Sequence, residues 1–283
     1  MEPWHAAITS AALMALGLAC HRRVRAVLPE DPPSALGRHH HLHPTPMAGV
    51  IPALLAMLAF AVLAPSGWLL AAVALTTAVG YLDDRGKSEG QEMRWYTKGL
   101  GILVATACAT VHVGLHHPQA EAQWLWVLVW LFAVTNAVNF MDNTDGVAAA
   151  AGGLGLLLAS AGEGPMAFVG MAFLGFLVFN WPNPLAFLGD SGSLCLGVCL
   201  GVASLDHGAR ASGELLHLTS LAPMVVFGLD FVQVIVARLI LGVPPWEGDR
   251  RHLTHVMIHL GVPRLVIAPA FAGLAWLGYQ LLA

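Results

Sequence analysis

Charged residues are scarce in this sequence. Asp, Glu, Lys and Arg make up 11% of the 283 residues and 57% are hydrophobic, whereas a soluble domain carries about 25% charged residues. So little polar surface cannot coat a globule in water, which excludes an ordinary soluble protein. The apolar residues also occur in blocks of roughly 15–20, close to the length that crosses a bilayer as a helix. The sequence therefore predicts one integral-membrane domain over residues 1–283.

Paired cysteines and an excess of basic residues are also missing. The four cysteines form no CxxC pair, so neither a disulfide framework nor a thiolate zinc site is predicted. The net charge of −4 indicates no nucleic-acid partner. No basic residue precedes the first apolar block, and Arg22, Arg23 and Arg25 follow it. These flanks are typical of a retained membrane span rather than a cleaved signal peptide.

The polar breaks between the apolar blocks predict about ten transmembrane helices. Backbone N–H and C=O groups in lipid must be satisfied within the segment, so we expect an all-α polytopic bundle. Two of the blocks are short for a full crossing, which leaves the count at ten give or take one. The expected ranges are 5–21, 47–63, 67–82, 99–115, 122–140, 147–161, 165–180, 192–205, 215–241 and 264–282.

Charge is distributed unevenly between the two ends of these helices. Ten of the 13 lysines and arginines lie in alternate connections, which are 22–46, 83–98, 141–146, 181–191 and 242–263. Arg264 borders the last of these, Arg238 lies near the same end of its helix, and only Arg210 falls on the other side. Cytoplasmic connections carry the excess of Lys and Arg, so these five are predicted to be cytoplasmic and both termini periplasmic. Aspartates fall in the same connections, among them Asp83, Asp84, Asp142, Asp145, Asp190 and Asp249. Carboxylates from distant parts of the chain are therefore expected to meet at one face of the membrane.

The first segment that suggests chemistry is 80–85, which contains Asp83 and Asp84. Two adjacent carboxylates repel each other, so keeping both ionised usually requires a nearby cation or metal. A solvated helix end is the alternative interpretation.

The second segment, 136–146, is rich in amides and acids. Asn136, Asn139 and Asn143 are spaced i, i+3, i+7, which places them on one face if the helix persists. Asp142 and Asp145 are likewise i, i+3 neighbours. Polar amides are costly at the end of an apolar span unless they bind or cap something. A helix cap accounts for one or two of these residues but not for five, so a binding role is favoured.

The third segment, 187–193, places Asp190 between glycines at the start of a helix. Such a carboxylate, together with the helix N–H groups, can approach a phosphate–metal complex closely. The alternative is that Asp190 or Ser191 only caps the helix.

The fourth segment, 244–255, combines two arginines with two histidines: Arg250, Arg251, His252 and His255. Guanidinium groups bind phosphate and imidazoles carry protons or bind metal. A basic loop that touches anionic lipid is the alternative.

Two further features stand apart from these segments. The histidines between 39 and 43 form either a metal-binding tract or a solvated loop. Asp230 lies inside an apolar block, where an acid is a functional hypothesis by default. A structural pair with Arg238 is its alternative explanation.

Taken in order, the four segments resemble the polyprenyl-phosphate N-acetylhexosamine-1-phosphate transferases, glycosyltransferase family 4. That family includes the GlcNAc-1-phosphate transferases and the phospho-MurNAc-pentapeptide transferase. The match extends from Pro44 to His255. The fourth segment lacks a run of three histidines, which favours the GlcNAc-1-phosphate branch.

The resemblance implies a role for each matching residue. Catalytic roles are expected for Asp83, Asp84, Asp142, Asp145 and His252. Substrate binding is expected of Asn139, Lys98, Arg250, Arg251 and His255. Asp190 and Asp83 are expected to be the metal ligands. Asp230 and Arg238 match a D-x7-R pattern of the GlcNAc-type branch.

The resemblance also implies a reaction. A sugar-1-phosphate, with GlcNAc-1-phosphate first, is expected to pass from a UDP-sugar to undecaprenyl phosphate with release of UMP. Mg²⁺, or Mn²⁺ in its place, is the expected cofactor, and the expected location is the bacterial inner membrane with the active site facing the cytoplasm. A homodimer is a further expectation. The alternatives are the phospho-MurNAc-pentapeptide reaction and a secondary transporter. Acids gathered at one membrane face and the lack of a visible internal repeat both argue against the transporter.

Overall fold

The computed structural model describes residues 4–19, 28–31, 44–64, 66–244 and 251–283. The histidine tract between 39 and 43, Asp249 and Arg250 lie outside these ranges, so the predictions about them stay predictions.

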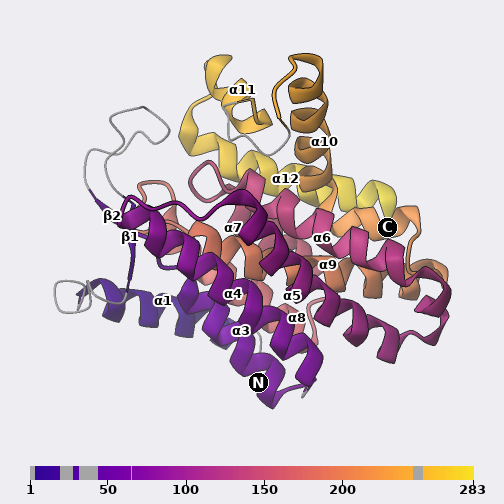
Figure 1. Ribbon diagram of the computed structural model, residues 1–283. Coiled ribbons are helices and arrows are strands. Elements are labelled where there is room, and N and C mark those ends of the chain that lie inside the picture. The colour runs from indigo at the N-terminus through magenta and orange to yellow at the C-terminus, as the bar shows by residue number, and fades with distance from the viewer. Residues whose placement is uncertain (1–3, 20–27, 32–43, 65, 245–250) are drawn as a thin grey trace.

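Every predicted apolar block coincides with helix in the structure, mostly within a few residues at each end (Figure 1). The helices are α1 (Trp4–Ala19), α3 (Val50–Val62), α4 (Gly67–Ser88), α5 (Trp95–His116), α6 (Trp124–Met141), α7 (Val147–Ala159), α8 (Gly164–Asn180), α9 (Gly189–Ser212), α10 (Val225–Ile240), α11 (Leu253–His259) and α12 (Arg264–Leu282). Two 3₁₀ segments, η1 (Pro118–Gln123) and η2 (Leu218–Met224), precede α6 and α10.

The helical membrane character of the fold is confirmed. Within the described part of the chain, five helical stretches are long and apolar enough to cross a bilayer: α5, α6, α9, η2 with α10, and α12. The count of ten spans and the periplasmic position of the termini stay predictions.

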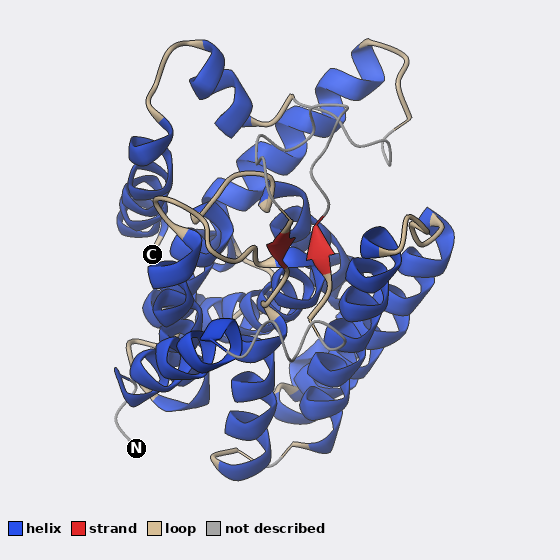
Figure 2. Cartoon of the chain, turned by 90° about the vertical axis from the view of Figure 1, so that its left-hand side faces the viewer, coloured by secondary structure: helices blue, strands red, loops and turns tan. Residues whose placement is uncertain are grey.

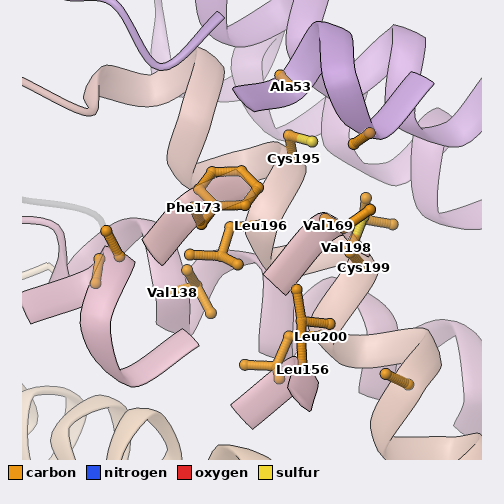
Figure 3. Packing of buried hydrophobic residues seen from close by; sticks show 14 of the residues in the cluster. Ala53, Val138, Leu156, Val169, Phe173, Cys195, Leu196, Val198, Cys199 and Leu200 are labelled. Carbon is orange, nitrogen blue, oxygen red and sulfur yellow. The ribbon is translucent and has the colours of Figure 1, made fainter. Parts of the chain in front are cut away.

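Helix α9 forms the centre of the bundle. It packs against α4, α6 and α7, and its middle is fully buried. Figure 2 shows the whole helical bundle turned by 90° from the view of Figure 1. Figure 3 shows Cys195 and Cys199 of α9 as small apolar residues among the side chains of neighbouring helices. Close approach is possible because α9 is rich in small residues: a Cβ on Gly197 would lie 2.8 Å from the backbone of Thr135 in α6.

The predicted helix over 215–241 is broken. Residues 218–224 form η2, which contains Pro223, and α10 starts only at Val225. Proline lacks an N–H group and disfavours the α conformation of the residue before it, which explains the interruption. Figure 1 shows α10 and α11 extending beyond the rest of the bundle.

A short antiparallel pair of strands departs from the all-α prediction. Strand β1 (Glu30–Asp31) pairs with β2 (Thr45–Pro46). The chain after β2 then pairs with Phe187: Phe187 N–H donates to Pro46 O at 2.9 Å, and Ala48 N–H donates to Phe187 O at 2.9 Å. These two hydrogen bonds fix the start of the third sequence segment, 187–193, which leads into α9.

Candidate active site

Two lysines and two aspartates form a compact charged cluster between the end of α4 and the start of α9. Lys87 Nζ lies 3.1 Å from Asp83 Oδ2 and 2.7 Å from Asp190 Oδ2. Lys98 Nζ from α5 lies 3.2 Å and 2.5 Å from the same two oxygens. Asp83 and Asp190 are both buried. The predicted convergence of Asp83, Lys98 and Asp190 is therefore present in the structure.

Lys87 was not singled out in the sequence, although it is i+4 to Asp83, a spacing at which opposite charges meet on a helix. It lies beyond the apolar residues 67–82 of α4. Burial works against its charge, but the carboxylates of Asp190 and Asp83 hold the pKa of Lys87 well above its usual value. The cluster is thus a place where buried carboxylates are neutralised by cations.

The donor set of this cluster suits Mg²⁺. The ion is usually bound in proteins by one or two carboxylates, with water and substrate phosphates completing the shell. Asp83 and Asp190 supply two carboxylates directed at the same cationic groups. Among the described residues, no three acidic, histidine or cysteine side chains are grouped as a complete protein metal site would be. The residues therefore fit a metal that is shared with a phosphate substrate.

Asp84 has a different environment from its neighbour Asp83. Its side chain is fully buried; Oδ1 accepts the N–H of Asp190 at 2.8 Å and Oδ2 accepts the N–H of Ser191 at 3.0 Å. These are N–H groups of the first turn of α9, which have no partner within the helix. Burial, reinforced by the Asp190 carboxylate, raises the pKa of Asp84 to about 7. Asp84 of α4 thus caps the neighbouring helix α9, for which the sequence alone suggests a cap from Asp190 or Ser191.

Glycines make this close approach possible. A Cβ on Gly80 of α4 would overlap the backbone of Asp190 and Ser191, and a Cβ on Gly49 would overlap Leu188 O. Gly189 has a φ of +63°, which side-chain-bearing residues rarely adopt. The start of α9 is therefore positioned by backbone contacts as much as by the Asp84 carboxylate.

Asn139 brings α6 into the same site. Its Nδ2 donates to Asp190 Oδ1 at 2.8 Å and to Ser193 Oγ at 2.8 Å. Asn136 instead donates to Phe132 O in its own helix. Three amides were predicted to share one helix face. Within the described part of the chain, Asn139 is the one whose side chain binds Asp190.

The expectation that Asp142 and Asp145 are helical neighbours is wrong. Helix α6 ends at Met141, and the chain turns through Gly146 with a φ of +78° before α7. Burial, reinforced by the carboxylates of Asp190 and Asp84, raises the pKa of Asp142 well above its usual range. Asp142 therefore lies within the electrostatic reach of the cluster at the start of α9.

Asn180 holds the other side of this turn. Its Oδ1 accepts the N–H of Gly146 at 2.8 Å, and its Nδ2 donates to Ala186 O at 2.9 Å. One buried amide thus joins the turn before α7 to the segment before α9. No sequence signal identified this residue, because both of its partners are backbone groups.

The histidine segment is bound to two other elements. His252 Nδ1 lies 2.7 Å from Asp230 Oδ2 in α10, and Thr254 Oγ1 donates to Asn143 Oδ1 at 2.6 Å. The ring centres of His252 and His255 are 6.3 Å apart. The substrate-binding role of Arg251 stays a prediction. The segment is thus joined to the chain that follows Asp142.

The fold and this site define a class: a helical membrane protein that gathers buried acids and lysines suited to a phosphate–metal complex. The chain belongs to glycosyl transferase family 4, whose family model matches residues 66–208, half of the chain.

Curated relatives agree with this assignment. The chain is 31% identical to a decaprenyl-phosphate N-acetylglucosaminephosphotransferase of Mycolicibacterium smegmatis, over 66% of this chain and 55% of that protein. It is 29% identical to the enzyme of the same name from Mycobacterium leprae, over 79% of this chain and 69% of that protein. A phospho-N-acetylmuramoyl-pentapeptide-transferase of Moorella thermoacetica is 34% identical over 40% of this chain and 36% of its own length. The chain thus spans between about half and two thirds of the length of the first two relatives.

Proposed function

We propose that this chain transfers N-acetylglucosamine-1-phosphate from a UDP-sugar to a polyprenyl phosphate and releases UMP. The observation that carries the proposal is the cluster in which Lys87 and Lys98 both contact Asp83 and Asp190. Phosphoryl transfer depends mainly on positioning and charge neutralisation. Two ammonium groups beside two carboxylates offer both a place for a cation and donors for phosphate oxygens.

The residues divide the work as follows. An oxygen of the lipid phosphate attacks the β-phosphorus of the UDP-sugar, a new P–O bond forms, and the bond to the oxygen bridging the two phosphates breaks as UMP leaves. Asp83 accepts the proton of the lipid phosphate. Asp84 is less suited to that task, because both its oxygens accept backbone N–H groups, whereas in the described part of the chain Asp83 accepts only one, from Met93 at 3.1 Å.

Mg²⁺, held by Asp190 and Asp83, would neutralise charge on the pyrophosphate when bound. Asn139 keeps Asp190 oriented through its 2.8 Å hydrogen bond. Lys87 and Lys98 would turn from the carboxylates to phosphate oxygens as substrate enters. The residues expected to bind the nucleotide and the sugar are Asp142, Asp145, Arg250, Arg251, His252 and His255. The site would lie on the cytoplasmic side of a bacterial inner membrane.

The test is UMP release by the purified, detergent-solubilised chain. Donors should include UDP-GlcNAc, UDP-GalNAc and UDP-MurNAc-pentapeptide, each with undecaprenyl or decaprenyl phosphate and with Mg²⁺, Mn²⁺ or chelator. We expect UMP from UDP-GlcNAc only when both lipid and metal are present. Turnover of UDP-MurNAc-pentapeptide alone, the reaction named for the Moorella relative, would replace this proposal. Folded protein that releases no UMP with any donor would refute it.

A further inference from the structure

Asp230 is a buried acid to which the proposed reaction gives no task. It lies in α10 with its side chain fully buried. Its Oδ2 lies 2.7 Å from His252 Nδ1, and its Oδ1 accepts the N–H of Leu253 at 2.7 Å. One carboxylate thus fixes both the imidazole and the backbone at the start of α11.

This contact determines where the proton of His252 resides. An ionised carboxylate only accepts hydrogen bonds, and a neutral imidazole has one donor and one acceptor nitrogen. Nδ1 facing Asp230 must therefore carry the hydrogen, which leaves Nε2 as the acceptor. A hydrogen bond of this kind to one ring nitrogen sets which nitrogen is available for chemistry.

The surroundings restrict the ring further. His252 is itself buried, with 4% of its surface exposed. Water therefore cannot readily replace Asp230 as the hydrogen-bond partner of the imidazole. Two positions later, Thr254 is fully buried and bonded to Asn143. The imidazole is therefore fixed by Asp230 of α10, and the chain two residues later is bound to the loop after α6.

We propose that Asp230 is a positioning residue that holds His252 in the Nδ1–H form, with Nε2 presented to the substrate phosphates. The inference rests on the proposed function, in which His252 contacts the substrate. Asp230→Asn tests it, because the amide can still accept from Leu253 N–H but directs N–H groups at His252 Nδ1. The ring would then take the opposite tautomer in an almost unchanged shape.

Kinetics should show that Asp230 acts through His252. We expect Asp230→Asn to lower kcat for UMP release by about 10- to 100-fold, with a smaller change in KM for the UDP-sugar. In a His252→Gln background the same substitution should cost no more than about twofold, because coupled residues are non-additive. Full activity of Asp230→Asn, or losses that multiply in the double variant, would overturn the proposal.

A matched control exists in the same chain. Asp206 Oδ1 lies 2.8 Å from His117 Nε2, and Asp206 is sixteen residues after Asp190 along α9, roughly 24 Å along the helix axis. Asp206→Asn should therefore leave kcat unchanged. The control pair is partly exposed, with 20% of the His117 and 31% of the Asp206 side chain accessible. A comparable loss in that variant would show that replacing any Asp–His pair in this bundle impairs the enzyme through folding alone.

A measurement independent of turnover separates this inference from the proposed function. The imidazole nitrogen signals of ¹⁵N-histidine-labelled protein in lipid bilayers can be recorded, and His252 is identified by their loss in His252→Gln. We expect a protonated Nδ1 in the wild type and an unprotonated Nδ1 in Asp230→Asn. An unprotonated Nδ1 in the wild type would refute the positioning role, whether or not the protein releases UMP. The expected pattern in a protein that releases no UMP would support the contact while the transferase proposal failed.

Discussion

The carboxylate–lysine cluster and the histidine segment are held in place by different means. At the start of α9, the backbones of α3, α4 and α9 meet across Gly49 and Gly80, and Asp84 binds two backbone N–H groups. The histidine segment depends on side-chain hydrogen bonds, chiefly those of Asp230 and Thr254. A geometry fixed by backbone contact tolerates no added volume, whereas one fixed by hydrogen bonds is sensitive to a change of chemistry at constant volume. The two regions can therefore be perturbed separately.

The largest effect is expected from removing the charge at the centre of the cluster. Asp190→Asn should lower UMP release by about a thousandfold, because an amide neither balances two ammonium groups nor binds Mg²⁺ as a carboxylate does. Thermal unfolding should show that the protein stays folded. Activity near the wild-type level would contradict the assignment of Asp190 to the metal.

Added volume at the α4–α9 contact should come next. Gly80→Ala places a Cβ within 2.4 Å of Ser191 N, a backbone atom that cannot move aside cheaply. Overpacking of this kind costs about 1–3 kcal/mol or more, and we expect a lower unfolding temperature together with a large loss of activity.

Gly67→Ala is the matched control, because Gly67 begins the same helix and a Cβ there would meet nothing within 4 Å. It should be neutral or slightly stabilising, since alanine favours the helix over glycine. Equal unfolding temperatures for the two variants would show that the α4–α9 contact does not fix the site.

The adjacent aspartates provide a sharper comparison within one region. Asp84→Asn removes one acceptor from the cap of α9 and directs an amide N–H₂ at a buried N–H, at a cost of about 1–3 kcal/mol. Asp83→Asn changes the oxygen that faces Lys87 and Lys98, while the remaining amide oxygen can still accept the N–H of Met93, which Asp83 Oδ1 accepts at 3.1 Å. We expect Asp84→Asn to lower the unfolding temperature more, and Asp83→Asn to lower kcat more relative to its effect on stability. The reverse order would exchange the roles of the two acids.

The sequence predicted the helices better than it predicted their contacts. Apolar runs of sufficient length appear as helices because a run in lipid has few alternatives to helix, whereas α11 forms inside the predicted connection 242–263. The meeting of Asp83, Lys98 and Asp190 was also predictable, since charge placed all three at one face. The capping of α9 by Asp84 was not, because it depends on a side chain 106 positions away from the N–H of Asp190.

Two other features show what local patterns miss. The spacing of Asn143 suggested a shared helix face with Asn139, but α6 ends before it, and its carbonyl instead accepts from Thr254. One interpretation of the sequence pairs Asp230 with Arg238, because the two residues lie in the same apolar block. The structure directs the Asp230 carboxylate at His252, a residue on a different element. Tertiary partners of this kind leave no periodic trace in a single sequence.

The smallest effect is expected at the tether of the histidine segment. Thr254→Val keeps the volume but removes the donor to Asn143 Oδ1, which still accepts from Thr144 Oγ1 at 2.9 Å. No acceptor is left unpaired, so the cost should be only about 0.5–1.5 kcal/mol, with a loss of less than about tenfold in kcat/KM. Hydrogen–deuterium exchange in residues 251–259 should rise, because α11 loses its connection to the loop after α6. Thr144→Val removes the other donor to the same oxygen within that loop, and it should leave exchange in α11 unchanged. If both variants loosen α11 equally, the connection lies in the conformation of Asn143 itself and not in the bond from Thr254.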